Sequence, residues 1–217
     1  MCRLMIYRGP PILMEELVTK PTRSITSQAL NCQERRQGSV NGDGFGVGWY
    51  DQVDPRGANP GALGEPCIFT SVQPAWNNLN LSRLCRKIRS PLIFAHVRAA
   101  YPGMVVSEAN CHPFTLGRYM WMHNGGISHF AAIRRRMEAE LTDELYAAVQ
   151  GKSDSELAFA LFLNKLPSLT EPLAAGVLQR AMVETLAHIQ RLVAAATAAG
   201  AGAARLPRAE RIRPRAR

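Results

Sequence analysis

The sequence predicts an α+β fold in which strands dominate the first 123 residues and helices dominate the remainder. Short apolar stretches rich in β-branched and aromatic residues, which are typical of strands, recur as far as His123. Beyond His123 the apolar residues recur at helical spacing instead. Because the strands come in groups and do not alternate with helices, we expect α+β layers and no run of βαβ units.

The expected strands cover residues 2–7, 47–51, 67–72, 92–98 and 119–123. The first is followed by Gly9-Pro10-Pro11, which predicts a bend. Residues 92–98 form an apolar run typical of a strand that is covered on both faces, and the run ends in polar residues, with His96 and Arg98 close together. Site residues commonly gather at such strand ends.

The expected helices lie at 79–88, 130–141, 153–166 and from 170 to about Gly200. In the second, Phe130, Ile133, Met137 and Leu141 recur at helical spacing. The third opens with Ser153-Asp154-Ser155-Glu156, the pattern of a capping box. Residues 53–66, rich in Pro and Gly, predict a surface loop, whereas 12–40 give no clear assignment.

The composition is that of an ordinary globular protein of one large domain or two small ones, with 47% hydrophobic and 20% charged residues in 217. No apolar run approaches the ~20 residues that a membrane helix needs, and Pro10-Pro11 interrupts the start before a signal peptide could form. The five cysteines are odd in number and lack a C-x-x-C pair, so neither a disulfide framework nor a zinc site is indicated. We expect a reducing, cytoplasmic location and no membrane partner.

The net charge of +9 is unevenly distributed along the chain. Residues 205–217 contain six arginines and one acid, so more than half of the net charge lies in this tail. Arg134-Arg135-Arg136 is the other basic run, and its helical pattern favours a solvated face. The charge therefore gives no reason to expect a nucleic-acid partner.

Asn41 to Tyr50 contain four glycines at alternating positions, which invites comparison with a nucleotide-binding loop. The G-x-G-x-x-G spacing fails, and a strand pattern follows where a phosphate loop would open a helix. The better interpretation is a glycine-lined turn entering a strand, to which another backbone or a substrate approaches closely.

Cys2 follows the initiator Met1 directly. Removal of Met1 would leave a thiol and a free α-amino group on one residue, and therefore a nucleophile with its own base. The alternative is that Met-Cys stands by accident in front of an ordinary buried strand.

Seven short segments, in this order along the chain, together resemble the class II glutamine amidotransferases, a family of N-terminal-nucleophile hydrolases: 2–4, 41–50, 74–77, 95–100, 110–114, 123–125 and 153–156. The likeness is greatest to the stand-alone branch that includes a fungal glutathione-degrading subunit and a bacterial γ-glutamyl hydrolase of ergothioneine synthesis. The resemblance implies an αββα sandwich and cleavage of the γ-amide of glutamine or of a γ-glutamyl compound, without metal or cofactor.

The resemblance also implies a role for each of five residues. Cys2 would attack the γ-carbonyl carbon, and Asn124 with Gly125 would hold the developing oxyanion. Arg98 would bind the substrate α-carboxylate, and Asp154 would bind the α-ammonium. Each has a structural alternative: a surface ion pair for Arg98, a hairpin turn for Asn124-Gly125, and a helix cap for Asp154.

The chain departs from the family near its end, where residues 205–217 show no apolar period. We expect an amidotransferase domain at 2–204 that lacks the last strands of its second sheet, followed by a disordered Arg-rich tail. Unpaired sheet edges would then predict low solubility or dependence on a partner subunit. The alternative function is that of a catalytically silent, truncated subunit that works through a partner.

Overall fold

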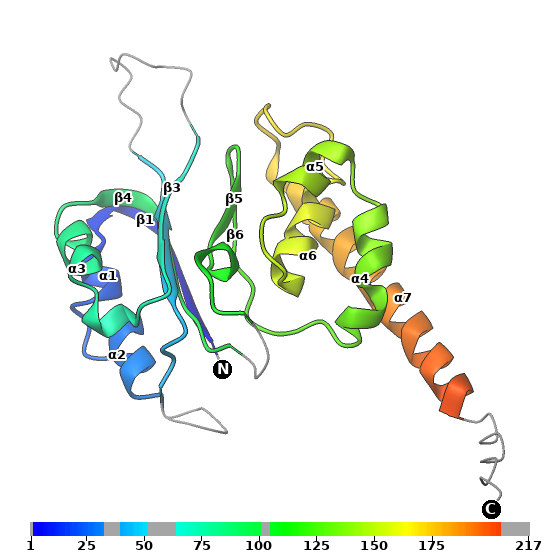
Figure 1. Cartoon of the computed structure of the whole chain (residues 1–217). Helices are drawn as coiled ribbons and strands as arrows, with labels where there is room; N and C mark the ends of the chain where they lie inside the picture. The colour runs from blue at the N-terminus through cyan, green and yellow to red at the C-terminus, as the bar shows by residue number, and fades with distance from the viewer. Residues whose placement is uncertain (1, 33–39, 52–63, 101–104, 205–217) are drawn as a thin grey trace, which may run out of the picture.

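The structure, a computed structural model, describes residues 2–32, 40–51, 64–100 and 105–204, with side chains as far as Gly200. Four layers follow one another across the molecule (Figure 1). Three short helices cover one face of a four-stranded sheet, a two-stranded sheet lies beyond its other face, and four helices cover that hairpin. This is the predicted αββα arrangement. The predicted tail lies outside the described residues.

The four-stranded sheet is antiparallel throughout, in the order β1-β4-β2-β3. Its strands are β1 (Arg3–Leu13), β2 (Phe45–Trp49), β3 (Cys67–Ser71) and β4 (Arg89–Val97). The apolar run around residue 93 thus forms an inner strand, as its composition predicted.

Strand β1 is longer than predicted. The bend expected at Gly9-Pro10-Pro11 does not end the strand, and the pairing with β4 resumes after a register shift between Arg8 and Ile12. Proline lacks an N–H, which an edge strand with an interrupted ladder tolerates.

The first core lies between the four-stranded sheet and the helices α1 (Glu15–Val18), α2 (Ile25–Leu30) and α3 (Leu79–Cys85). It is built from fully buried apolar side chains of both layers, among them Met14, Val18, Ile25, Phe45, Val47, Leu81, Ile93 and Val97. A short 3-10 turn, η1 (Ala75–Asn77), precedes α3. The α1–α2 segment gave no clear pattern in the sequence because both helices are too short to show a full apolar period.

The other half consists of the hairpin β5 (Phe114–Leu116) and β6 (Tyr119–Trp121) with α4 (Phe130–Ala139), α5 (Asp143–Ala148), α6 (Asp154–Leu163) and α7 (Ala175–Ala204). Every residue from 155 to 163 is buried, so α6 is the central helix, and it packs against α4, α5 and α7. The sequence located α4, α6 and α7 but missed α5, and α7 begins at Ala175 and not at Thr170.

The glycine-lined strand β2 allows the two sheets to approach closely. A Cβ at Gly46 would collide with the carbonyl oxygen of His112, and one at Gly48 would collide with the sulfur of Met120. The predicted close approach of another backbone is therefore confirmed: the 112–113 segment and β6 pack onto the backbone of β2.

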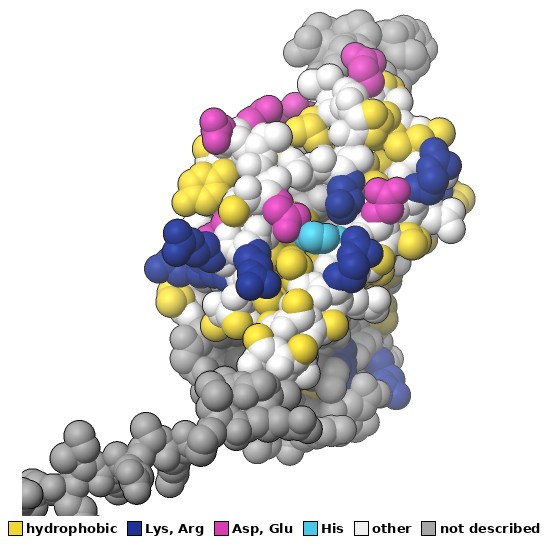
Figure 2. Space-filling view, turned by 90° about the vertical axis from the view of Figure 1, so that its right-hand side faces the viewer, with side chains coloured by type: hydrophobic (Ala, Val, Ile, Leu, Met, Phe, Trp, Pro, Cys, Tyr) yellow, Lys and Arg dark blue, Asp and Glu magenta, His cyan; other side chains and the backbone are white. Residues whose placement is uncertain are grey.

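The outer helical face carries charges of both signs, with Lys and Arg side chains interspersed among Asp and Glu (Figure 2). Arg134 and Glu138 form an ion pair at 2.6 Å along α4, and the His188 ring of α7 lies 2.7 Å from the Glu140 carboxylate. Nowhere in the described chain is a helix both long and apolar enough to cross a membrane.

Candidate active site at the end of the four-stranded sheet

Strand pairing brings Cys2 beside the segment that follows β4. Val97, the last residue of β4, pairs with Arg3 on one side and with Phe45 on the other. Cys2 immediately precedes Arg3, and Arg98 immediately follows Val97. The antiparallel register therefore places the chain start and the end of the apolar run at the same end of the sheet.

The Cys2 side chain is half-buried and contacts the backbone of Ala99. The Ala99 N–H donates to the sulfur at 3.2 Å, and the sulfur lies 3.5 Å from the Ala99 carbonyl oxygen. These contacts fix the orientation of the thiol at the wall of a cavity of about 340 Å³.

Four of the five predicted site residues line this cavity: Cys2, Arg98, Gly125 and Asp154. The fifth, Asn124, lies next to it and donates from its side-chain amide to the Cys2 carbonyl oxygen at 3.0 Å. Residues more than 120 positions apart in sequence are thus brought together.

The Asn124-Gly125 pair does not form a hairpin turn. Strand β6 ends at Trp121, and the chain then passes through an exposed loop into α4 at Phe130. The structural alternative for this pair is therefore wrong. The loop places Gly125 at the cavity, and the Asn124 amide lies beside it on the Cys2 carbonyl.

Arg98 is buried, at 4% exposed, so the alternative of a surface ion pair is also wrong. Its guanidinium donates to the carbonyl oxygens of Asp43, at 3.5 Å, and Val105, at 3.1 Å. Within the described residues it forms no ion pair with a carboxylate. A buried cation without a counter-charge is unfavourable, so this site favours an anionic ligand.

Asp154 lies in the first turn of α6, where its charge stabilises the helix N-terminus as the structural alternative expected, although the N-cap itself is the preceding residue. Ser153 is the N-cap of α6, and its hydroxyl accepts the Glu156 N–H at 3.2 Å. The Asp154 carboxylate instead accepts the Ile127 N–H at 2.7 Å, which joins α6 to the loop that carries Asn124 and Gly125. The first turn of α6 therefore supplies an anion to the cavity wall and also holds that loop.

Two histidines stack behind the cavity, and one of them, His112, also lines it. The rings of His96 and His112 have centroids 4.3 Å apart, and both are buried. Burial lowers the pKa of His96 to about 3 and, together with the neighbouring His96, that of His112 to about 2. Both are therefore neutral near pH 7 and do not compete with Arg98 for an anion.

The sequence reasoning missed Asn110 and Lys152 as cavity residues. Asn110 opens the 110–114 segment of the resemblance but had no role assigned to it, and it lies in the 3-10 turn η2 (Glu108–Asn110). Lys152 directly precedes the capping box, and its charge next to Asp154 was the one available sign.

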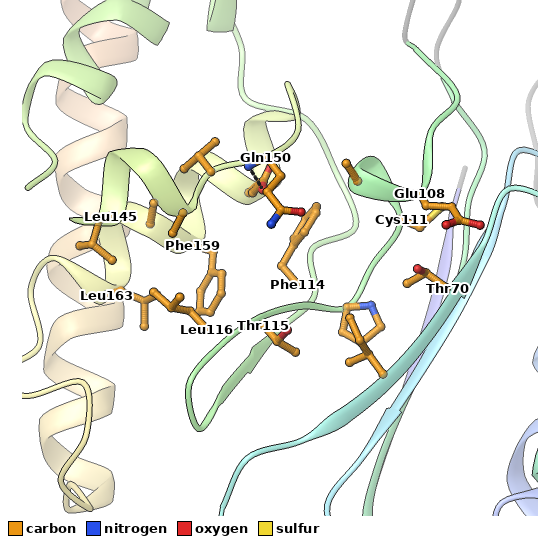
Figure 3. Close-up of a pocket in the computed structure, with 17 residues that line it drawn as sticks. Thr70, Glu108, Cys111, Phe114, Thr115, Leu116, Leu145, Gln150, Phe159 and Leu163 are labelled. Carbon is orange, nitrogen blue, oxygen red and sulfur yellow. Dashed lines mark hydrogen bonds between the residues drawn. The ribbon is translucent and has the colours of Figure 1, made fainter. Parts of the chain in front are cut away.

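A second, larger cavity of about 450 Å³ lies on the other side of residues 108–113 (Figure 3). Side chains alternate along this wall: Asn110 and His112 face the first cavity, whereas Cys111 and Pro113 face the second. Cys111 and His112 therefore do not form a dyad. Burial raises the pKa of Cys111 to about 11, which keeps it a thiol at neutral pH, and no predicted site residue lines the second cavity.

Comparison with known proteins gives the family. The family model described as glutamine amidotransferases class-II matches residues 14–203. A probable glutamine amidotransferase of Saccharomyces cerevisiae, DUG3, is 47% identical over 172 residues, which are 78% of this chain and 46% of the yeast protein. The gamma-glutamyl-hercynylcysteine sulfoxide hydrolase of Mycobacterium tuberculosis is 30% identical over 127 residues, which are 58% of this chain and 50% of that protein.

Among solved structures, a glutamine aminotransferase class-II domain protein from Silicibacter pomeroyi superposes with a TM-score of 0.53 at 29% identity, covering 83% of this chain and 62% of that one. The chain spans about half the length of the curated relatives that it matches. The family match begins at Met14, so the assignment of Cys2 depends on the geometry given above. Because the family model matches residues 14–203 and the predicted αββα layers are present, the chain belongs to the class II glutamine amidotransferases.

Proposed function

We propose that this protein cleaves the γ-amide bond of glutamine or of a γ-glutamyl compound through a γ-glutamyl thioester on Cys2. One observation supports this most strongly: a thiol, a buried guanidinium and a carboxylate surround one cavity of about 340 Å³. A glutamyl head group carries an α-carboxylate, an α-ammonium and an electrophilic γ-carbonyl. The guanidinium complements the α-carboxylate, the carboxylate complements the α-ammonium, and the thiol can attack the γ-carbonyl.

Substrate binding follows from the charges at the cavity. Arg98 lacks a carboxylate partner among the described residues, and its planar guanidinium suits a bidentate contact with the α-carboxylate. The Asp154 carboxylate accepts the Ile127 N–H at 2.7 Å and the Ser155 hydroxyl at 3.4 Å, and its remaining lone pairs can accept from the α-ammonium. The two charges then orient the γ-carbonyl toward the sulfur.

The chemical steps need a chain that begins at Cys2. The free α-amine takes the thiol proton, and the sulfur attacks the γ-carbonyl carbon to give a tetrahedral oxyanion. The Asn124 amide and the Gly125 N–H stabilise that oxygen. The C–N bond then breaks, the α-ammonium returns its proton to the leaving ammonia or amine, and the thioester remains. Water, deprotonated by the same amine, attacks the thioester and releases glutamate.

The names of the relatives support this proposal at the level of reaction class, because one is a probable glutamine amidotransferase and another a gamma-glutamyl hydrolase. We further propose a cytoplasmic location and a partner subunit. If no thioester forms on Cys2, the proposed activity is wrong and the alternative function, that of a catalytically silent subunit, takes its place.

The test is glutamate release from glutamine and from γ-glutamyl peptides by protein with a processed N-terminus. Cys2→Ala should abolish release, whereas Cys67→Ala, which removes an exposed thiol on β3, should leave it unchanged. Release that persists in Cys2→Ala would contradict the proposal.

A further inference from the structure

The Cys2 cavity holds one more positive charge than a glutamine head group needs. Its charged lining residues are Arg98, Lys152 and Asp154. Arg98 and Asp154 match the α-carboxylate and the α-ammonium, as proposed above. Lys152 remains, and its ammonium group makes no ion pair with any residue that the structure describes.

Lys152 projects from a backbone turn that is fixed from two sides. The Lys152 N–H donates to the Asn110 side-chain oxygen at 3.1 Å. The carboxylate of Glu156 accepts the N–H groups of Gln150, at 2.8 Å, and Gly151, at 2.7 Å. Both acceptor side chains are buried, at 5% exposed for Asn110 and 8% for Glu156, so these hydrogen bonds are shielded from water.

The turn also packs too closely to carry a side chain at its centre. A Cβ on Gly151 would lie 2.5 Å from the Glu156 carboxylate and 2.6 Å from both the Ala109 carbonyl oxygen and the Asn110 side-chain oxygen. Only glycine fits there without a shift of these groups. The stem of Lys152 therefore starts from a well-defined point on the cavity wall.

Arg98 and Lys152 differ in how deeply they are buried. Arg98 is buried at the end of the sheet, whereas Lys152 is exposed just before α6. A substrate with its α-carboxylate on Arg98 would have its leaving group nearer to solvent, within reach of a flexible four-carbon stem.

We propose that Lys152 binds a second carboxylate, one carried by the leaving group, and that it makes the enzyme prefer γ-glutamyl amino acids and peptides to glutamine. The proposal rests on the function proposed above. Lys152 is a specificity-determining residue here and takes no part in bond cleavage.

The test compares two substrates that differ in one charge: γ-glutamylglycine, with a free carboxylate, and γ-glutamylglycinamide, with a neutral amide. The wild-type ratio of their kcat/KM values should favour the acid by about two- to fivefold, the size expected for one exposed ion pair. Lys152→Met should bring the ratio close to one, and Lys152→Glu should invert it. Lys87→Met, which removes an exposed lysine beyond α3, should keep the wild-type ratio.

The outcomes separate the two proposals. Hydrolysis that depends on Cys2 but shows the same ratio in wild type and Lys152→Met would overturn the role of Lys152 and leave the proposed function standing. Failure to hydrolyse either compound or glutamine would instead overturn the proposed function, and the role of Lys152 with it.

Discussion

The side-chain amide of Asn124 donates a hydrogen bond to the backbone carbonyl of Cys2, at 3.0 Å. This contact joins the loop after β6 to the first described residue of the chain, and it holds the amide next to the proposed nucleophile. A primary amide has two N–H groups. One can therefore retain the Cys2 carbonyl while the other is directed at the oxyanion.

Asn124→Ala should lower kcat for glutamine by about 10²–10³, the effect of removing one preorganised oxyanion donor. KM should change little, because the amide interacts mainly with charge that develops in the transition state. Steady-state glutamate release gives both constants. A change confined to KM would show that Asn124 merely positions the substrate.

Arg98→Lys should reduce kcat/KM for glutamine by about 10- to 100-fold, mostly through KM. Lysine keeps the charge but loses the bidentate donor geometry that a carboxylate prefers. Arg98 also donates to the Asp43 and Val105 carbonyls, so thermal melting should be recorded alongside. An unchanged KM in a folded variant would contradict the proposed carboxylate contact.

Asp154→Asn separates the charge of this residue from its structural contact. Asparagine can still accept the Ile127 N–H, so the loop should stay in place and the melting temperature should shift little. Loss of the negative charge should lower kcat/KM at least about tenfold if the α-ammonium binds there.

The matched control is Asp143→Asn, at the first position of α5 behind its own cap, Thr142. It should melt like the wild type and retain wild-type activity. Equal activity of the Asp154 and Asp143 variants would assign Asp154 a purely structural role.

The stacked histidines predict a loss of stability in mild acid. Their pKa values, lowered by burial to about 3 for His96 and about 2 for His112, lie below the ~6.5 of an unfolded imidazole. Between about pH 6.5 and 3 the unfolded chain therefore binds more protons than the folded one. The free energy of unfolding should fall as pH falls, by up to about 1.4 kcal/mol per pH unit for each imidazole. Glu156 acts in the opposite sense, because burial raises its pKa.

Urea denaturation at pH 7, 6 and 5 measures this slope. His112→Asn should flatten it, whereas His129→Asn should not. His129 is exposed at φ +57°, a conformation that Asn tolerates. Equal slopes in the wild type and His112→Asn would show that the pair does not carry the pH dependence.

Much of this architecture could be predicted because local pattern and tertiary environment agree. The run around Ile93 is apolar because β4 lies between two strands, and the glycines of β2 occur where His112 and Met120 press on its backbone. Ser153 caps α6 as its pattern indicates. Half of the predicted capping box is absent, however, because the Glu156 carboxylate turns to Gln150 and Gly151.

The predictions failed where long-range pairing decides the structure. Gly9-Pro10-Pro11 is a turn signal on its own, but the pairing of Ile12 with Ser90 extends β1 past it. Lys152 was missed because its environment depends on Asn110, 42 residues earlier in the chain. The packing of α6 against the 108–113 segment decides which surface charge faces the cavity. The apolar periodicity of the sequence does not contain this information.

The most direct test of the Cys2 chemistry is the intact mass of native protein before and after treatment with an electrophilic glutamine analogue, 6-diazo-5-oxonorleucine. We predict a chain that begins at Cys2 and gains one adduct, which maps to Cys2 and is prevented by excess glutamine. Active protein that retains Met1, or an adduct mapped to another cysteine, would contradict it.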